Sequence, residues 1–178
     1  MGRTKLISDE EKLKLIHQAT FKTLLQYGFS KTSLEDIAKL AGISRSSLYL
    51  HYKNKKEIVI STMETIMQKR LVRAKEAILG NESLQVKIYN IMDIWFLELW
   101  NLAYESPHKD ELFALKNNLL YQTKEKADLE FKTLLNSLFK DKELAEIIFF
   151  AIKGYQTDVP SRRILQKRIK TLIKKLIG

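Results

Sequence analysis

Apolar side chains recur at helical spacing along almost the whole chain. In the first segment, for example, Leu13, Ile16, Ala19 and Leu24 fall on one face of a helix. Strand-like alternation is not sustained anywhere, and only 6 glycines and 2 prolines interrupt the pattern in 178 residues. The sequence therefore predicts an all-α fold of about nine helices.

Capping residues mark the ends of the predicted N-terminal helices. The first helix begins at a capping box of Ser8 and Glu11 and ends at Gly28, which can adopt a left-handed conformation. Ser44 caps the short helix "RSSLYLH", and Asn54 begins a long fourth helix that continues to Gly80. Each of these helices is thus delimited by local sequence signals.

The second helix is very short, and two capping pairs compete for its start. It begins either at Thr32 with Glu35 or at Ser33 with Asp36, and it ends at Gly42. The rest of the chain predicts a strongly apolar helix over about 83–104, followed by a break at "ESPHKD". Helical spacing then continues over about 109–139, 142–155 and 161–177.

The two short helices, joined through "LAGIS", predict a helix-turn-helix in which the glycine permits the tight turn. In such a motif the helix after the turn enters the major groove, with its N-terminal residues at the base edges. Arg45, Ser46 and Ser47 occupy those positions, while Leu48 anchors the helix to its own domain. The alternative is an ordinary corner of a helical bundle with a hydrophilic outer side.

The segment "TSLEDIAKLAGISRSSLYLHYKNKKEI" resembles the DNA-binding signature of the TetR family of bacterial transcriptional repressors. The resemblance covers roughly residues 8–58 and implies a three-helix DNA-binding domain over 1–55 and a ligand-binding and dimerisation domain over 56–178. It also implies a homodimer that binds a palindromic operator and is released by a small-molecule inducer. The chain is near the short end for this family, which bears on the size of any ligand cavity.

The resemblance further implies which side chains contact DNA. Arg45 is the candidate for base readout, because a guanidinium can bond O6 and N7 of guanine, and Ser46 can add a hydrogen bond or a thymine-methyl contact. Arg3 and Lys5 either reach the DNA or belong to a solvated tail. Positions that contact phosphates or lie at the DNA backbone in such proteins are occupied by Ser33, Ser47, Tyr49, His51 and Lys55.

The apolar helix "IYNIMDIWFLELWNLAYES" carries aromatic residues on nearly all sides, which is typical of the centre of a bundle. Its aromatic side chains predict a pocket for a small apolar or aromatic ligand, with a packed core as the equally supported alternative. Asp93 and Glu98 interrupt the helix and either receive a cationic ligand group or, as we favour, are exposed to solvent or form structural ion pairs. The candidate ligand-binding residues are Trp95, Trp100, Tyr104 and Tyr121.

The last segment, "PSRRILQKRIKTLIKKLIG", is basic and amphipathic and allows two interpretations. With 31 Lys and Arg against 21 Asp and Glu, the chain has a net charge of +10, which favours nucleic acid or an anionic membrane surface. Apolar positions at spacings of 4, 3 and 4 also suit a helix-pair interface, which we favour. The predicted dimer contacts are Leu165, Ile169, Leu172 and Leu176, with Ile147 and Ala151 on the preceding helix.

Catalytic and metal-binding motifs are absent from the sequence. It has no cysteine, its three histidines form no H-E-x-x-H pair, and no glycine-rich phosphate loop occurs. No apolar run approaches the roughly 20 residues that span a bilayer. We therefore expect a cytoplasmic, soluble regulator that is not an enzyme and needs no metal or cofactor.

Overall fold

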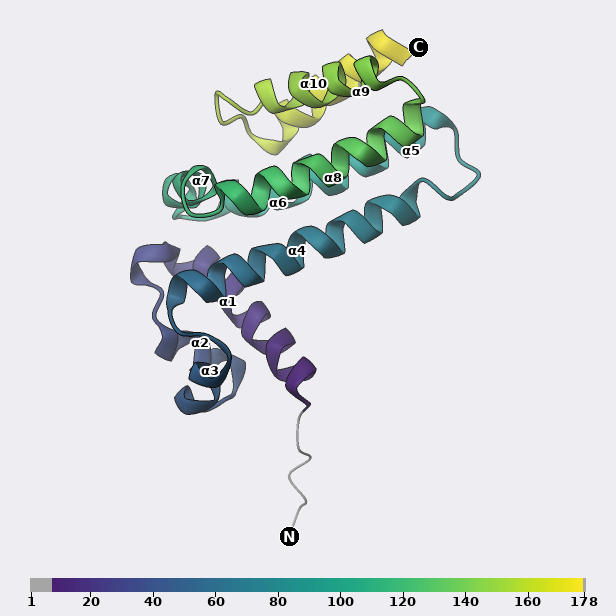
Figure 1. Ribbon diagram of the computed structural model, residues 1–178. Helices are drawn as coiled ribbons and strands as arrows, with labels where there is room; N and C mark the ends of the chain where they lie inside the picture. Colours follow the sequence, from purple (N-terminus) through teal and green to yellow (C-terminus); the bar gives the residue numbers. More distant parts are fainter. Residues whose placement is uncertain (1–7, 178) are drawn as a thin grey trace. The chain divides into compact units, whose positions relative to one another are not determined.

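The computed structural model describes residues 8–177, which are entirely helical apart from turns and loops. Because α5, η1 and α6 follow one another without a turn, these residues form nine continuous helices, and the all-α prediction is confirmed (Figure 1). The elements are α1 (Asp9–Lys31), α2 (Leu34–Ala41), α3 (Arg45–His51), α4 (Lys55–Ala77), α5 (Leu84–Met92), the π-helical segment η1 (Asp93–Leu97), α6 (Glu98–Glu105), α7 (Lys109–Asn117), α8 (Tyr121–Phe139), α9 (Lys142–Gly154) and α10 (Arg162–Ile177).

The chain divides into two compact units. The first contains the residues up to Thr65 together with Ser106–Tyr121, and the second contains Ile66–Glu105 and the residues from Gln122 onward. α4 therefore contributes to both units, and α7 belongs to the first. The domain boundary predicted between residues 55 and 56 stays a prediction, because compactness alone does not show which part folds independently.

Two capping boxes define the first helices of the first unit. The hydroxyl of Ser8 accepts a hydrogen bond from the Glu11 N–H at 3.1 Å, and that of Ser33 accepts from the Asp36 N–H at 3.1 Å. Both acidic side chains accept a hydrogen bond from the backbone of the capping serine in return. The second helix thus begins at the Ser33 pair rather than at the Thr32 pair.

Gly28 bends α1 and does not end it. Its φ of 73° interrupts the helical path, which then continues to Lys31. A side chain at this position would be strained, and its Cβ would collide with the carboxylate of Glu111 on α7. The predicted end of the first helix at Gly28 is therefore corrected to a kink.

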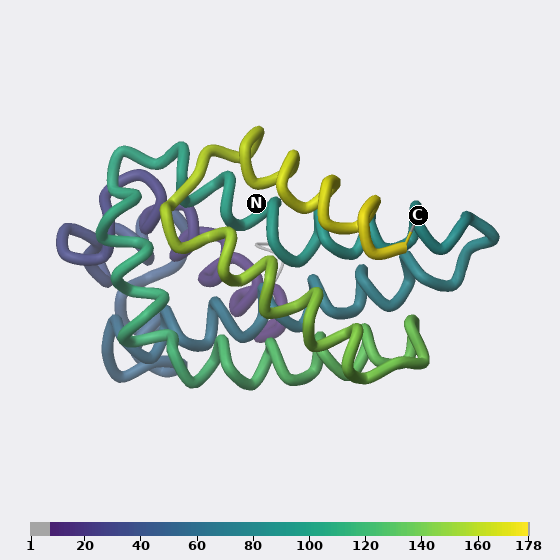
Figure 2. Tube along the Cα trace, turned by 90° about the horizontal axis from the view of Figure 1, so that it is seen from above, coloured from purple at the N-terminus to yellow at the C-terminus, as the bar shows by residue number. Residues whose placement is uncertain are grey.

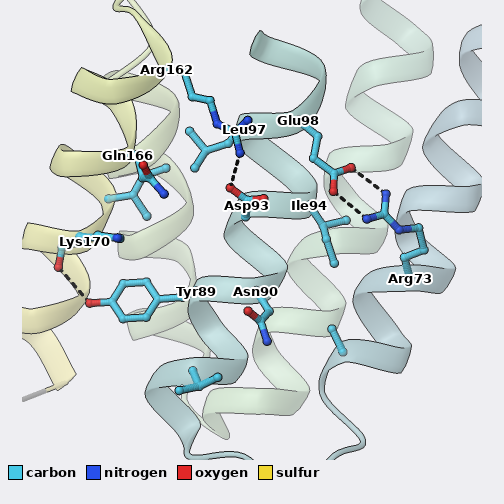
Figure 3. A pocket seen from close by; sticks show the side chains of 13 residues that line it. Arg73, Tyr89, Asn90, Asp93, Ile94, Leu97, Glu98, Arg162, Gln166 and Lys170 are labelled. Carbon is cyan, nitrogen blue, oxygen red and sulfur yellow. Dashed lines mark hydrogen bonds and ion pairs between the residues drawn. The ribbon is translucent and has the colours of Figure 1, made fainter. Parts of the chain in front are cut away.

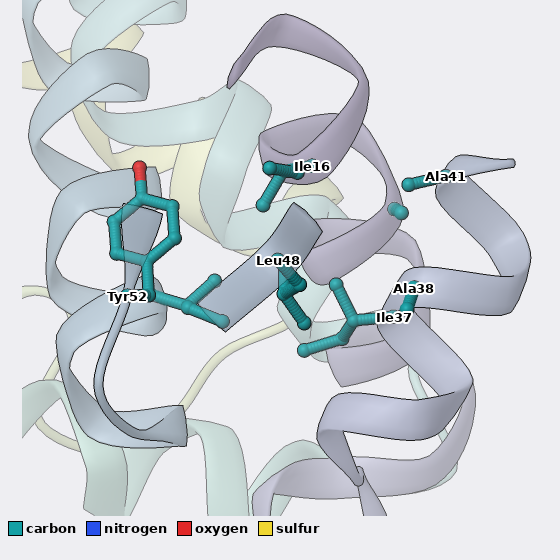
Figure 4. Packing of buried hydrophobic residues seen from close by; sticks show 8 residues of the cluster. Ile16, Ile37, Ala38, Ala41, Leu48 and Tyr52 are labelled. Atoms are coloured by element: carbon teal, nitrogen blue, oxygen red, sulfur yellow. The ribbon is translucent and has the colours of Figure 1, made fainter. Parts of the chain in front are cut away.

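The core of the helix-turn-helix joins α1, α2, α3 and the start of α4. Ile16, Ile37, Leu48 and Ile58 are completely buried in it, and Figure 4 shows Leu48 between Ile16 and Ile37. Burial of each such side chain is worth about 1.5–3 kcal/mol. The prediction that Leu48 anchors α3 is confirmed, and the opposite side of α3 is left to solvent.

Aromatic rings fill the centre of the second unit. Trp95 stacks on Phe131 of α8 with ring centroids 4.4 Å apart, and Phe96 meets the same ring edge-on at 5.8 Å. Phe149 of α9 adjoins both phenylalanines. The helix formed by α5, η1 and α6 therefore lies in the core of this unit. Helices α9 and α10 lie next to each other, and α10 packs on this central helix (Figures 1 and 2).

A buried arginine holds the π-helical segment. A π-helix forms its hydrogen bonds between more distant residues than an α-helix does, so backbone carbonyls need other donors where the two join. Arg70 of α4 donates to the Ile94 carbonyl at 2.9 and 2.5 Å and to the Trp95 carbonyl, and its guanidinium lies 5.3 Å from the centre of the Trp95 ring. Burial lowers the pKa of Arg70 to about 10. The side chain of Arg70 therefore connects α4 to the continuous helix α5–η1–α6.

The segment predicted as one helical stretch over 109–139 contains two helices, which is a correction. Asn118 has φ −109° and ψ −89°, so α7 ends before it, and α8 begins at Tyr121. No glycine or proline marks this break in the sequence. The only local signal is the pair Asn117 and Asn118, because asparagine forms helix interiors poorly.

Candidate functional site

The outer side of α3 presents a set of polar side chains to solvent. Ser44 caps this helix by accepting a hydrogen bond from the Ser47 N–H at 3.1 Å. Arg45, Ser46 and Tyr49 are exposed, while Ser47 and His51 are half-buried. Arg45 and Ser46, at the N-terminal end of α3, are therefore exposed to solvent.

Arg45 is oriented by two neighbours. Its guanidinium lies 5.6 Å from the centre of the Tyr49 ring, donates to the Tyr49 hydroxyl at 3.4 Å, and pairs with the Glu35 carboxylate at 3.6 Å. The hydrogen bond with Tyr49 raises the pKa of Arg45 above its ordinary value, so the side chain stays charged. The sequence suggested Glu35 only as a capping partner of Thr32, not as a partner of Arg45.

Two of the serines that we predicted to contact DNA also form local hydrogen bonds. Ser33 donates its hydroxyl to Asp36 at 2.5 Å within the α2 capping box, and the Ser46 hydroxyl lies 2.9 Å from that of Ser44. The carboxylate of Asp36 has a pKa below its ordinary value because of the Ser33 hydroxyl. Both serines remain exposed at the N-terminal ends of helices, where free backbone N–H groups favour anions.

Lys55 has an unexpected set of partners. Its ammonium donates to the carbonyl oxygens of Phe29 at 2.7 Å, Ser30 at 3.3 Å and Thr32 at 2.7 Å, and it lies 4.5 Å from the centre of the Phe29 ring. An ammonium has three donors, so these carbonyls occupy all of them. Lys55 therefore holds the chain between α1 and α2, directly before Ser33.

A hydrogen-bonded triangle supports the C-terminal end of α3. The Tyr52 hydroxyl lies 2.7 Å from His17 Nε2 and 3.1 Å from the Ser61 hydroxyl, and the Ser61 hydroxyl lies 3.3 Å from His17 Nε2. These residues come from α1, the end of α3 and α4. The triangle fixes the orientation of α3 relative to the two longer helices.

Sequence reasoning missed Leu50, which is 85% exposed on α3. Such exposure is unusual for a large apolar side chain placed between polar neighbours on the outer side of a helix. The available signal was its position two residues after the buried Leu48, because residues two apart point to different sides of a helix. Leu50 belongs to the same surface as Tyr49.

The predicted ligand-binding residues do not form one common site. Trp95 and Trp100 are buried, and their indole N–H groups donate to Asp128 at 3.3 Å and to the Pro160 carbonyl at 2.8 Å. Tyr104 is half-buried at the end of α6. Tyr121 is 54% exposed and belongs to the first unit. The structure thus favours the packed-core interpretation for the tryptophans.

An open groove of about 870 Å³ lies elsewhere in the second unit, between α4, the continuous helix α5–η1–α6, and α10 (Figure 3). Ile94, Leu97 and Ile169 give it an apolar floor. The amide side chains of Asn90 and Gln166 are also part of its lining. The sequence contained no signal for this groove, because its walls come from segments far apart in the chain.

Ion pairs form two sides of this groove. Arg73 of α4 donates to both carboxylate oxygens of Glu98 at 2.7 and 2.6 Å, and Arg162 of α10 pairs with Asp93 at 3.2 Å. Figure 3 shows Arg73 and Arg162 reaching from different helices to Glu98 and Asp93 on the helix between them. Of the two sequence interpretations of Asp93 and Glu98, the structure therefore shows the ion pairs.

The predicted dimer contacts require a correction. Leu165 and Ile169 are 0% and 2% exposed within the single chain, where α10 packs on α5 and η1, so they offer no surface to a partner. Helical spacing reveals an apolar stripe but not which neighbour covers it. The same burial removes the continuous apolar face that a membrane-surface helix needs. Among the other predicted contacts, Ala151 and Leu172 are half-buried, and Ile147 and Leu176 are exposed.

No helix within residues 8–177 is long and apolar enough to cross a bilayer. The same part of the chain holds no cluster of three or more His, Asp or Glu side chains arranged for a metal ion. Arg3 and Lys5, for which DNA contacts or a solvated tail were both open, lie outside the described residues.

Residues 16–62, which contain the capped helices α2 and α3 and their core, match the family model of the bacterial regulatory proteins of the tetR family. Residues 16–62 thus carry the N-terminal signature of the TetR family. It is 34% identical to the HTH-type transcriptional regulator TtgR of Pseudomonas putida over 77 residues, which are 42% of this chain and 36% of TtgR. The resemblance found in the sequence is thereby confirmed.

A second relative and a solved structure extend the comparison. The chain is 31% identical over 67 residues to YhgD, an uncharacterized HTH-type transcriptional regulator of Bacillus subtilis, over 38% of this chain and 35% of that protein. The matches therefore span about a third of the length of these curated relatives. A TetR family transcription regulator from Marinobacter aquaeolei has the same fold, with a TM-score of 0.61 at 20% identity over 96% of this chain and 88% of that chain. TetR-family members are transcriptional regulators rather than enzymes.

Proposed function

We propose that this protein is a homodimeric, DNA-binding transcriptional repressor that binds a palindromic operator and is released from it by a small molecule. The observation that carries the proposal is the exposed N-terminal part of α3, with Arg45 oriented by Tyr49 and the helix anchored by the buried Leu48. An α-helix fits the major groove, where a guanidinium reads guanine. As a regulator of genes, the protein acts in the cytoplasm.

We call the exposed side of α3 together with Ser33 the DNA-reading surface, and its side chains have different proposed roles. Arg45 reads a base, and Leu50 is placed to contact a thymine methyl group, because it is apolar and exposed on the same helix. Lys55 positions the chain before α2 rather than contacting a phosphate, because carbonyls occupy its donors. The proposed contacts to phosphates and sugars are made by Ser33, Ser46, Ser47, Tyr49 and His51.

Dimerisation is proposed to use the outer side of α9. Ile147 and Phe150 are 51% and 55% exposed there, and Ala151 and the exposed Gly154 leave room for close approach of a second helix. A two-fold axis would pair this side with itself. A dimer presents two α3 helices, which is what a palindromic operator with half-sites about one helical turn apart requires.

Release by a ligand is proposed to occur through a conformational equilibrium. A ligand can lower DNA affinity only if it favours a conformation in which the two α3 helices no longer match the half-sites. α4 is the element suited to transmit such a change, because it is one continuous helix with residues in both units.

The DNA-binding proposal is tested by selecting genomic fragments that the protein retains and comparing the palindrome they share with a scrambled duplex. We expect a strong preference for the palindrome, with affinity that falls steeply as salt rises. Gel-shift titrations at two salt concentrations measure both. Equal affinity for the two duplexes would leave only adhesion of a basic protein to DNA.

The assignment of Arg45 is tested with Arg45→Ala on operators changed at one base pair at a time. We expect a loss of about 1–3 kcal/mol of discrimination at one base pair per half-site. Lys174→Ala, which removes the same charge from the exposed side of α10, is the matched control and should leave the preference unchanged. If Arg45→Ala weakened all duplexes by one factor, Arg45 would be a backbone contact.

A further inference from the structure

The groove between α4, α5–η1–α6 and α10 combines an apolar floor with charged walls. Ile94, Leu97 and Ile169 form the floor, and the volume of about 870 Å³ is ample for a small organic molecule. In contrast, the aromatic cluster around Trp95 and Phe131 is filled by its own rings. The groove therefore offers space for a ligand that the aromatic cluster does not.

The charges of the groove lining do not cancel. The charged side chains of its lining are three cations, Arg73, Arg162 and Lys170, and two carboxylates, Asp93 and Glu98. Each carboxylate already pairs with one arginine, at 2.6 Å for Glu98 and 3.2 Å for Asp93. Lys170 has no ion pair within residues 8–177. The groove thus has an excess of one positive charge, at Lys170.

The backbone near Lys170 is fixed in place. The Tyr89 hydroxyl of α5 donates to the Lys170 carbonyl at 3.3 Å, and Ile169 beside it is buried in the floor. Figure 3 shows the ammonium end of Lys170 and the amide of Gln166 on the same wall of the groove. An anionic group at this wall would therefore meet a charged donor and a neutral donor.

We propose that this groove binds an amphipathic anion, whose carboxylate or phosphate ester lies at Lys170 and whose apolar body lies on the floor formed by Ile94, Leu97 and Ile169. This inference rests on the proposed function, because it names the chemical class of the releasing ligand. A cationic ligand would find both carboxylates already neutralised, and a neutral one would gain no ion pair with the exposed Lys170.

The groove also borders the helix that both units share. Arg73 lies on α4 and pairs with Glu98, directly after the π-helical segment. An occupant of the groove therefore contacts α4, whose first half belongs to the first unit. A ligand that binds better to one position of α4 shifts the equilibrium toward that position. Binding of the anion and loss of DNA affinity are therefore linked.

The test uses three probes with the same ten-carbon chain and different head groups: decanoate, decanol and decyltrimethylammonium. Isothermal titration of the full chain below the micelle concentrations should show decanoate binding about tenfold more tightly than either other probe. Decyl phosphate, which has the same chain length as decanoate, distinguishes a phosphate ester from a carboxylate as the preferred anion. Equal affinities for all head groups, or no saturable binding of decanoate, would overturn the proposal.

Lys170→Met is the decisive variant, because methionine keeps the length of the side chain and removes the charge. We expect it to lose about tenfold in decanoate affinity while its decanol affinity stays unchanged. Lys167→Met, on the exposed side of the same helix and outside the groove lining, is the matched control. Equal losses in both variants would assign the effect to the overall charge of α10 and reject the site. Thermal melting of both variants verifies that they fold.

Failure of this inference is distinguishable from failure of the proposed function. A wild-type protein that binds its palindrome selectively but shows no preference for decanoate rejects the anion site and leaves the regulator intact. A protein that binds decanoate through Lys170 but shows no sequence preference on DNA rejects the regulator instead. Where both hold, decanoate should lower operator affinity over the concentration range in which it binds, because linkage is reciprocal.

Discussion

Three cationic side chains show how partners determine the role of a charge. Arg45 is exposed and meets a phenol and a carboxylate, so its charge stays on the surface that we propose to bind DNA. Lys55 and Arg70 meet backbone carbonyls instead, at the start of α2 and at the π-helical segment. A residue whose donors are occupied inside the protein acts by holding backbone in place.

Lys55 provides the first prediction. Lys55→Met should lower the melting temperature and weaken binding to all DNA sequences alike, but it should leave the slope of log affinity against log salt unchanged. A lysine that contacts a phosphate contributes roughly one to that slope. Lys56→Met, one residue later and exposed, is the control for charge. A slope reduced by about one in Lys55→Met alone would show a phosphate contact.

Arg70 provides the second prediction. Arg70→Met should lower the free energy of unfolding by about 1–3 kcal/mol, because the carbonyls of Ile94 and Trp95 lose their donors in a buried place. Urea unfolding followed by tryptophan fluorescence measures this loss. Arg73→Met, three residues later and exposed, should cost less, because an exposed ion pair contributes little. Similar losses would mean that the carbonyls find new partners.

At the scale of elements, α7 is tied to the kink of α1. Glu111 accepts hydrogen bonds from the Ser30 N–H at 2.6 Å and from the Ser30 hydroxyl, and the Ser106 hydroxyl donates to the Leu25 carbonyl at 2.7 Å. The conformation of Gly28 makes room for the carboxylate. A segment from the middle of the chain thus supports the helix that leads into the helix-turn-helix.

This contact predicts a dependence of stability on pH. The hydrogen bond from the Ser30 hydroxyl lowers the pKa of Glu111 below its ordinary value of 4.5. Because the folded state favours the carboxylate, the stabilisation is present above pH 4.5 and is lost as the pH falls through the lower, folded pKa. Glu111→Gln should be less stable than the wild type at about pH 7, with a smaller difference at low pH.

Thermal unfolding at about pH 7 and at about pH 3 measures the two differences. Asp110→Asn, on the same helix and exposed, is the control and should leave the stability at neutral pH unchanged. A Glu111→Gln variant that lost equal stability at both pH values would show that the contact acts through packing rather than through charge.

At the scale of the whole molecule, the regulator proposal requires a second copy of the chain. The outer side of α9 carries exposed apolar residues, whereas the predicted stripe on α10 is covered within the chain. Ile147→Asp should therefore yield a monomer in analytical ultracentrifugation and abolish operator binding, although the DNA-reading surface is unchanged. An unpaired charge in such an interface costs several kcal/mol.

Leu79→Asp is the control for this prediction, because Leu79 is also exposed but lies in the turn after α4. It should leave both the dimer and the operator affinity intact. If Ile147→Asp stayed dimeric, the interface would have to be sought on another face of the second unit.

The sequence by itself determined the helix-turn-helix and its resemblance to the TetR family. The capping boxes and the left-handed Gly42 involve residues at most a few positions apart, and the local apolar spacing predicts that Leu48 faces inward. Local interactions of this kind depend little on the rest of the chain. Helical periodicity relative to Leu48 also predicts which polar residues lie on the outer side of α3.

Only the tertiary structure decided where the remaining side chains act. Arg70 finds its carbonyls 24 and 25 positions away, Lys55 up to 26, and Arg162 pairs with a carboxylate 69 positions away. An apolar stripe has the same spacing whether a partner chain or the protein's own core covers it, which is why Leu165 and Ile169 were misassigned. A groove has no sequence signal at all, because it is the space that three separately encoded helices leave between them.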